Sequence, residues 1–106
     1  MASPQTSTTK ILRLTVVSAL DLAKKDIFGA SDPYVQIYKE SFDTANDPTN
    51  KIRKTSVKKK TLNPVWGETF EFEVDPRLHV VVLDVMDANK ITRDDFLGRV
   101  KINLHR

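Results

Sequence analysis

The stretch GETFEFEV, residues 67–74, alternates between polar and apolar side chains from Thr69 to its end. Successive side chains of a β-strand point to opposite faces, so Phe70, Phe72 and Val74 share one face of such a strand. The intervening polar residues share the other face. This pattern predicts a strand that covers a hydrophobic core with one face and meets water with the other.

Five further segments have strand character, at 10–20, 33–39, 51–60, 79–86 and 96–104. In the last of them we expect Phe96, Val100, Ile102 and Leu104 to share the buried face. In 51–60, which is strongly basic, Val57 is the expected core residue. The connecting segments are rich in Asp, Asn and Pro, which favour turns. Six short strands at this spacing predict an all-β antiparallel sandwich.

A chain of 106 residues with 40% hydrophobic and 29% charged residues has the composition of one globular domain. We expect that domain over residues 10–106, after a disordered leader at 1–9 that lacks the apolar segment of a signal peptide. The chain has no cysteine, which excludes disulfides and thiolate metal sites and suits a reducing cytosol. The net charge of +3 favours an anionic partner.

Oxygen-bearing side chains are concentrated in two of the connecting segments. Asp26 and Asp32 precede the second strand, and Asp87, Asn89 and Asp95 precede the last. Loops of a sandwich collect at its two ends, so these two segments can meet. Carboxylate and amide oxygens are the ligands that Ca²⁺ prefers. Aspartate is also common in turns because it hydrogen-bonds to nearby backbone, so the pattern alone leaves both interpretations open.

Three motifs, in this order, resemble a C2 domain: SDPYV at 31–35, KKKTLNPVWGETFEF at 58–72 and VMDANKITRDDFLG at 85–98. LAKKDIFGASDPYV and ITRDDFLG are most similar to the C2 domain that begins the WW-containing HECT ubiquitin ligases. The resemblance runs from about Ile11 to Leu104. It implies an eight-stranded antiparallel sandwich whose end loops bind Ca²⁺ and then anionic phospholipid.

The resemblance assigns Asp26 and Asp32 to the first-loop Ca²⁺ ligands, and Asp87, Asn89 and Asp95 to the third-loop ligands. Asn89 departs from the family pattern, in which an aspartate is common at this place. Its amide oxygen can coordinate a cation but brings no charge. Because affinity for Ca²⁺ follows the charge of the ligands, we expect one ion and not two.

Ile27 and Phe28 lie between the two aspartates of the first loop. Beside a Ca²⁺ site, we expect these side chains to insert into the membrane interface. Burying one such side chain contributes roughly 1.5–3 kcal/mol. The alternative is that Phe28 folds back as a small cluster under its own loop.

Segment 51–60 carries six basic residues: Lys51, Arg53, Lys54, Lys58, Lys59 and Lys60. One interpretation is an edge strand that lysine protects from aggregation. The other is a patch for anionic lipid, either phosphatidylserine or a phosphoinositide, as C2 domains often have at this strand. Each basic residue near an anionic surface contributes about 1 kcal/mol. Nucleic acid is not expected, because aromatic residues are not interleaved with the basic ones.

The resemblance implies eight strands, whereas the sequence predicts six. We therefore expect a sandwich that is incomplete at its C-terminal end, with the last strands after INLHR, residues 102–106. An unpaired sheet edge follows, and a partner, a swapped copy or residues outside this chain would complete the sheet.

No catalytic constellation is visible, and the two histidines, His79 and His105, form no site with a nucleophile. The chain is therefore expected to be a non-catalytic module. The leading hypothesis is Ca²⁺-dependent binding to anionic phospholipid, which targets a cytoplasmic HECT-type ubiquitin ligase to membranes. Members of that family also use this domain to bind and inhibit their own HECT domain. The alternative is a Ca²⁺-independent protein-interaction domain that uses its basic strand.

Overall fold

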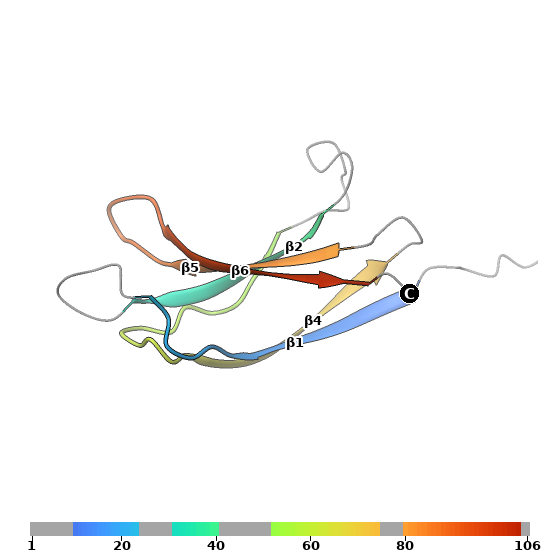
Figure 1. Cartoon of the computed structure of the whole chain (residues 1–106), viewed down its shortest axis with the longest axis horizontal. Coiled ribbons are helices and arrows are strands. Elements are labelled where there is room, and N and C mark those ends of the chain that lie inside the picture. The colour runs from blue at the N-terminus through green and yellow to red at the C-terminus, as the bar shows by residue number, and fades with distance from the viewer. Residues whose placement is uncertain (1–9, 24–30, 41–51, 75–79, 105–106) are drawn as a thin grey trace, which may run out of the picture.

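The computed structural model of the chain describes residues 10–23, 31–40, 52–74 and 80–104 (Figure 1). Their six strands are β1 (Lys10–Ser18), β2 (Pro33–Glu40), β3 (Arg53–Lys54), β4 (Val65–Val74), β5 (Val80–Asp87) and β6 (Asp95–Asn103). One sheet pairs β1 with β4, and the other has the order β3-β2-β5-β6. Every pair is antiparallel. Within the described ranges, no helix is long and apolar enough to cross a membrane.

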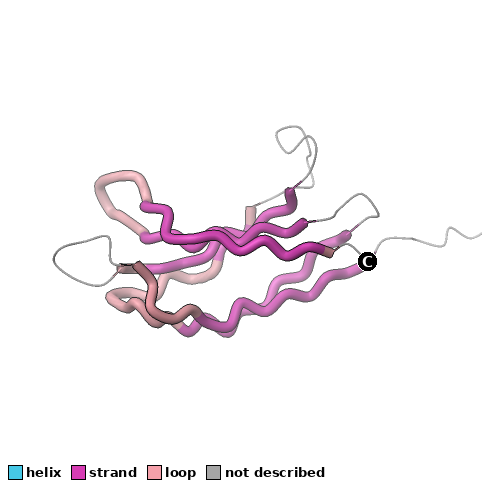
Figure 2. The backbone as a smooth tube through the Cα atoms, in the orientation of Figure 1, coloured by secondary structure: helices cyan, strands magenta, loops and turns pink. Residues whose placement is uncertain are grey.

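The two sheets form two layers, and several connecting loops gather at one end of them, on the left of Figure 2. The all-β antiparallel sandwich predicted from the sequence is therefore confirmed. Five of the predicted strands agree with β1, β2, β4, β5 and β6 to within two residues at each end.

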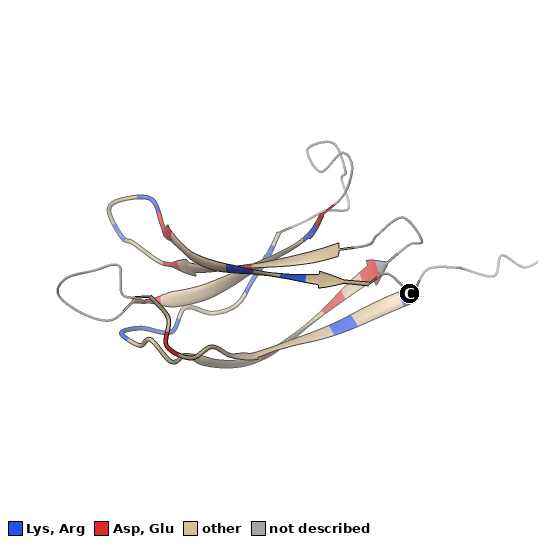
Figure 3. Ribbon diagram, in the orientation of Figure 1, with Lys and Arg blue, Asp and Glu red and all other residues tan. Residues whose placement is uncertain are grey.

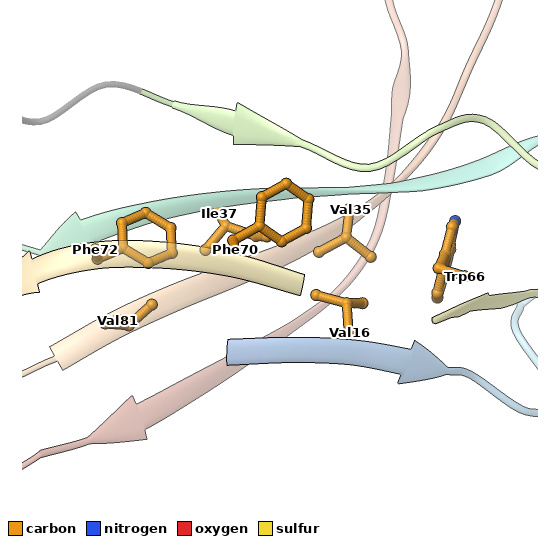
Figure 4. Close-up of a cluster of buried hydrophobic side chains, with 7 residues drawn as sticks. All are labelled: Val16, Val35, Ile37, Trp66, Phe70, Phe72 and Val81. Atoms are coloured by element: carbon orange, nitrogen blue, oxygen red, sulfur yellow. The ribbon is translucent and has the colours of Figure 1, made fainter. Parts of the chain in front are cut away.

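The hydrophobic core lies between the two sheets, and both of them contribute to it (Figure 4). Ile37 of β2 and Val81 of β5 are fully buried, and Phe70 and Phe72 of β4 are 8% and 7% exposed. The alternation in GETFEFEV thus predicted the buried face correctly for both phenylalanines. The core cluster consists of Val16, Val35, Ile37, Trp66, Phe70, Phe72 and Val81.

The prediction of a strand over 51–60 is wrong beyond Lys54, because the backbone leaves the ladder after β3. Thr55 donates its N–H to the carbonyl of Val35, and Lys58 donates to that of Pro33. The two donors are three residues apart, whereas the two acceptors on β2 are only two apart. A regular antiparallel ladder has equal spacing on both strands, so this segment does not continue as a strand. Val57 is 42% exposed, whereas Thr55 is buried.

The prediction that Phe96 shares the buried face of β6 is also wrong. A register shift at the start of β6 pairs Val85 with Gly98 but Met86 with Phe96, which leaves one extra residue between the two pairs. Phe96 is consequently 48% exposed, and its ring lies 5.4 Å from the guanidinium carbon of Arg99. Val100 is 54% exposed on this edge strand, and Ile102 and Leu104 pack against the core as expected.

Candidate functional site

Three described segments lie at one end of the sandwich, on the left of Figure 1, and we call this the loop end. They are residues 19–23 after β1, the lysine segment at 55–64 between β3 and β4, and the β5–β6 loop at 88–94. Backbone hydrogen bonds join the first two, from Ala19 N–H to the Pro64 carbonyl and from Leu22 N–H to the Leu62 carbonyl, both 3.0 Å long. Four of the predicted Ca²⁺ ligands lie at or beside this end: Asp32, Asp87, Asn89 and Asp95.

Asp32 lies immediately before β2 and bonds to both neighbouring segments. Its N–H donates to Oδ1 of Asp87 at 2.8 Å, and its carbonyl accepts the N–H of Ala88 at 3.0 Å. Its own Oδ1 accepts the N–H of Lys60 at 2.7 Å. The backbone of Lys60 has a positive φ of 55°. The structure thus brings Asp32 and Asp87 together, as the sequence predicted for residues of two separate loops.

Asp87 is only 5% exposed, which is unusual for a carboxylate. A buried carboxylate is stable when hydrogen bonds or a cation compensate for the loss of water. The ion pairs formed among the described residues are Arg13–Glu71, Arg99–Asp84 and Lys101–Glu40. None of these pairs includes Asp87, Asp32 or Asp95. A cation beside the carboxylate of Asp87 would therefore be stabilised by its charge.

Asp95 begins β6 and is the register partner of Asp87. The side-chain amide nitrogen of Asn89 donates to the Arg93 carbonyl at 2.8 Å and to Oδ2 of Asp95 at 3.3 Å. The predicted ligands Asn89 and Asp95 are therefore in contact. The nitrogen of Asn89, and not its oxygen, faces Asp95. This nitrogen lies between two acceptor oxygens, those of the Arg93 carbonyl and of Asp95.

Asp94 is a functional candidate that the sequence reasoning missed. Its Oδ2 accepts a hydrogen bond from the hydroxyl of Tyr34, and its Oδ1 accepts the N–H of Asn89 at 2.9 Å. The backbone N–H of Asn89 and then the Tyr34 hydroxyl lower the pKa of Asp94. Burial and the Asp94 carboxylate raise the pKa of Tyr34 to about 12. No local signal in the sequence singled it out, because its partner Tyr34 lies in a distant strand.

The predicted donor set consists of carboxylate and amide oxygens, which are the ligands that hard cations prefer. It is not complete within the part of the chain that the structure describes, where no three acidic or histidine side chains form a group that could hold a metal ion. The remaining predicted ligand, Asp26, lies outside the described residues, as do Ile27 and Phe28.

The basic residues predicted as a lipid patch divide into two groups, and Lys51 lies outside the described residues. The guanidinium of Arg53 lies 5.4 and 5.7 Å from the ring centres of Phe70 and Phe72, so it covers the core between the sheets. The amino group of Lys54 lies 5.9 Å from the ring centre of Tyr34.

The second group, Lys58, Lys59 and Lys60, lies in the lysine segment at the loop end. Lys90 and Arg93 of the β5–β6 loop add two further cations there. Figure 3 shows basic residues on both of these loops, close to acidic ones. The loop end therefore presents cations around the aspartates.

Ile91 is an exposed apolar residue that the sequence reasoning did not single out. It lies in the β5–β6 loop and is 97% exposed. Lys90 precedes it, and Arg93 follows two residues later. Its isolation in an otherwise polar loop was the available signal.

The sequence matches the C2 domain family model over residues 10–106. It is 52% identical over 94 residues to E3 ubiquitin-protein ligase Nedd-4 of Drosophila melanogaster, a match that covers 88% of this chain and 9% of that protein. It is 44% identical over 100 residues to E3 ubiquitin-protein ligase NEDD4 of Mus musculus, covering 92% and 11%. The chain thus spans only about a tenth of the length of these two relatives.

Among solved structures, the fold is similar to the C2A domain of plant extended synaptotagmin 1. The TM-score is 0.76 and the sequence identity is 36%, and the match covers 89% of this chain and 68% of that one.

Proposed function

Because the chain belongs to the C2 domain family, we propose that it is a targeting module that binds anionic phospholipid membranes in a Ca²⁺-dependent way. C2 domains are typically non-catalytic, and we assign no reaction to this chain. The observation that carries the proposal is the buried carboxylate of Asp87, which contacts Asp32 and is the register partner of Asp95.

Asp26, Asp32, Asp87 and Asp95 are the proposed carboxylate ligands, with Asn89 as a neutral one. A bound Ca²⁺ ion supplies positive charge and open coordination positions for the phosphate or carboxylate oxygens of a lipid. Without that charge, the aspartates repel an anionic surface. Asp32 holds the site together, because its backbone fixes the side chain of Asp87 and the start of the β5–β6 loop.

The surrounding residues supply the rest of the proposed membrane contact. Lys58, Lys59 and Lys60 meet anionic headgroups, at about 1 kcal/mol for each cation that reaches the surface. Ile27 and Phe28 remain proposed insertion residues, and the exposure of Ile91 adds a third. Lys54 and Arg53 contribute less to lipid binding than the sequence suggested, because their charged groups already lie against aromatic rings.

For the parent protein, we propose a cytoplasmic HECT-type ubiquitin ligase. The two NEDD4 relatives support this proposal through their identity to the chain, although the match covers only about a tenth of each of them. In such a protein the module would bring a catalytic domain to the membrane. Contact between the loop end and the HECT domain would hold that domain inactive until lipid competes for the same surface.

A Ca²⁺-independent protein-interaction domain is the second candidate. It is favoured by the hydrogen bonds that already satisfy Asp32 and Asn89, and by the lack of a three-carboxylate group among the described residues. In this case the exposed lysines would bind an acidic partner.

Liposome co-sedimentation of two charge-matched variants distinguishes the candidates. Asp32→Asn keeps an acceptor for the Lys60 N–H and removes one ligand charge, so we expect the Ca²⁺ concentration for half-maximal binding to phosphatidylserine vesicles to rise at least about tenfold. Asp21→Asn is the control, because Asp21 is exposed in residues 19–23 and has a φ of 53°, which asparagine tolerates. It should bind like the wild type. Equal binding of all three proteins in Ca²⁺ and in chelator would support the second candidate.

A further inference from the structure

The β5–β6 loop is fastened to β2 at both of its ends. At its start, Ala88 donates its N–H to the carbonyl of Asp32, the residue just before β2. At its end, Asp94 accepts a hydrogen bond from the hydroxyl of Tyr34, the second residue of β2. Tyr34 is 5% exposed, so its ring is held by packing and its hydroxyl has a fixed position.

Both carboxylate oxygens of Asp94 accept hydrogen bonds from within the protein. Oδ2 accepts the Tyr34 hydroxyl and Oδ1 accepts the backbone N–H of Asn89. The carboxylate of Asp95, the next residue, has a different environment. Its Oδ2 accepts one long hydrogen bond, of 3.3 Å, from the side chain of Asn89. Of the two adjacent aspartates, Asp95 therefore has more acceptor capacity left for a cation than Asp94.

The same bonds fix Asn89 from two sides. Its backbone is held by Asp94, and its side chain is held by the Arg93 carbonyl and by Asp95. The hydroxyl of Tyr34 is thus connected, through Asp94, to the backbone of the proposed ligand Asn89.

We propose that Tyr34 and Asp94 form a latch that positions the β5–β6 loop for cation binding, and that neither residue is itself a ligand. This inference rests on the proposed Ca²⁺-dependent function. Loss of the latch lowers the fraction of molecules whose loop is competent to bind, and apparent affinity falls in proportion to that fraction. A positioning residue therefore shifts the Ca²⁺ half-point of lipid binding and leaves the maximal binding unchanged.

Tyr34→Phe tests the latch, because it removes one hydroxyl from a buried ring. The matched control is Tyr38→Phe on the same face of β2, where the hydroxyl donates to Oδ2 of Asp84 at 3.0 Å, away from the loop end. Each variant loses one hydroxyl–carboxylate hydrogen bond, so a merely structural effect would move both alike. We expect Tyr34→Phe to raise the Ca²⁺ half-point about three- to tenfold with an unchanged plateau, and Tyr38→Phe to leave it unchanged.

A second measurement needs no ion. In chelator, amide hydrogen exchange at Asn89, followed by NMR, should be faster in Tyr34→Phe than in the wild type and unchanged in Tyr38→Phe. Equal exchange rates, or equal Ca²⁺ half-points for the two variants, would overturn the latch. If lipid binding by the wild-type protein did not depend on Ca²⁺, the proposed function would be overturned. The assignment of the latch to cation binding would then fall with it, whatever the exchange rates.

Discussion

Asn89 is the one neutral side chain among the proposed ligands of the cation. Its amide nitrogen lies between the Arg93 carbonyl and Oδ2 of Asp95, so a neutral donor occupies a position between two oxygens. The sequence predicted Asn89 as a ligand without charge. The structure adds that its oxygen must turn towards the ion before it can coordinate, whereas a carboxylate would present an oxygen in either orientation.

Replacing Asn89 with aspartate should therefore strengthen ion binding. Asn89→Asp places a second carboxylate beside Asp95, and we expect about a tenfold rise in Ca²⁺ affinity or a second bound ion. In chelator the same variant should unfold at a lower temperature than the wild type, because the two carboxylates repel each other. Calorimetric titration and thermal unfolding with and without Ca²⁺ measure both effects. Unchanged affinity, stoichiometry and ion-free stability would show that this position does not face the ion.

At the scale of elements, the sequence predicted strands well and irregular segments poorly. Alternation located β4 and its buried phenylalanines, because it depends only on which face meets water. It failed for the lysine segment, where Thr55 is buried in place of Val57. The Thr55 hydroxyl accepts the N–H of Val35 and donates to the Ser56 carbonyl. A polar side chain that replaces ladder hydrogen bonds is invisible to a hydrophobic pattern.

Part of the arrangement of the candidate site follows from the sequence, and part does not. Spacing and resemblance selected Asp32, Asp87 and Asp95, and the structure joins Asp32 to Asp87 through a hydrogen bond and pairs Asp87 with Asp95. The structural role of Asp94 was not predictable, because it depends on Tyr34, which is sixty residues away in the chain. Phe96 was misplaced because one extra residue in β6 reverses the facing of every residue before it.

The basic residues of β3 and of the lysine segment should respond differently to mutation. Lys59 is exposed at the loop end, so Lys59→Ala should weaken binding to anionic vesicles by about fivefold, or ~1 kcal/mol, without changing the melting temperature. Arg53 covers Phe70 and Phe72, so Arg53→Ala should lower the unfolding free energy by roughly 1–2 kcal/mol.

Vesicle binding at low salt and thermal unfolding measure the two effects. The smaller loss of vesicle binding is expected for Arg53→Ala. If Arg53→Ala weakened vesicle binding more than Lys59→Ala and left the unfolding free energy unchanged, the lipid patch would lie on β3.

In the whole molecule, the residues that stabilise the fold and the residues proposed to bind lie in different places. The core holds the two sheets together, and the polar chemistry is concentrated at the loop end. The described residues contain six strands, and in them β1 and β6 each pair with a single neighbour. Asp87 and Asp95 lie in β5 and β6, and Asp32 lies immediately before β2, so the described strands position three of the proposed ligands.

The measurement that tests this account most directly is a Ca²⁺ titration of the wild-type chain followed by two-dimensional amide NMR, with Mg²⁺ as the control ion. We predict saturable shifts at Asp32 and in the segment from Asp87 to Asp95, with no change at Glu40, Val80 or Asn103 at the opposite end of the sheet. Ca²⁺ should be more effective than Mg²⁺, which demands stricter geometry. An absence of saturable shifts, or shifts spread evenly over the sandwich, would contradict a cation site at the loop end.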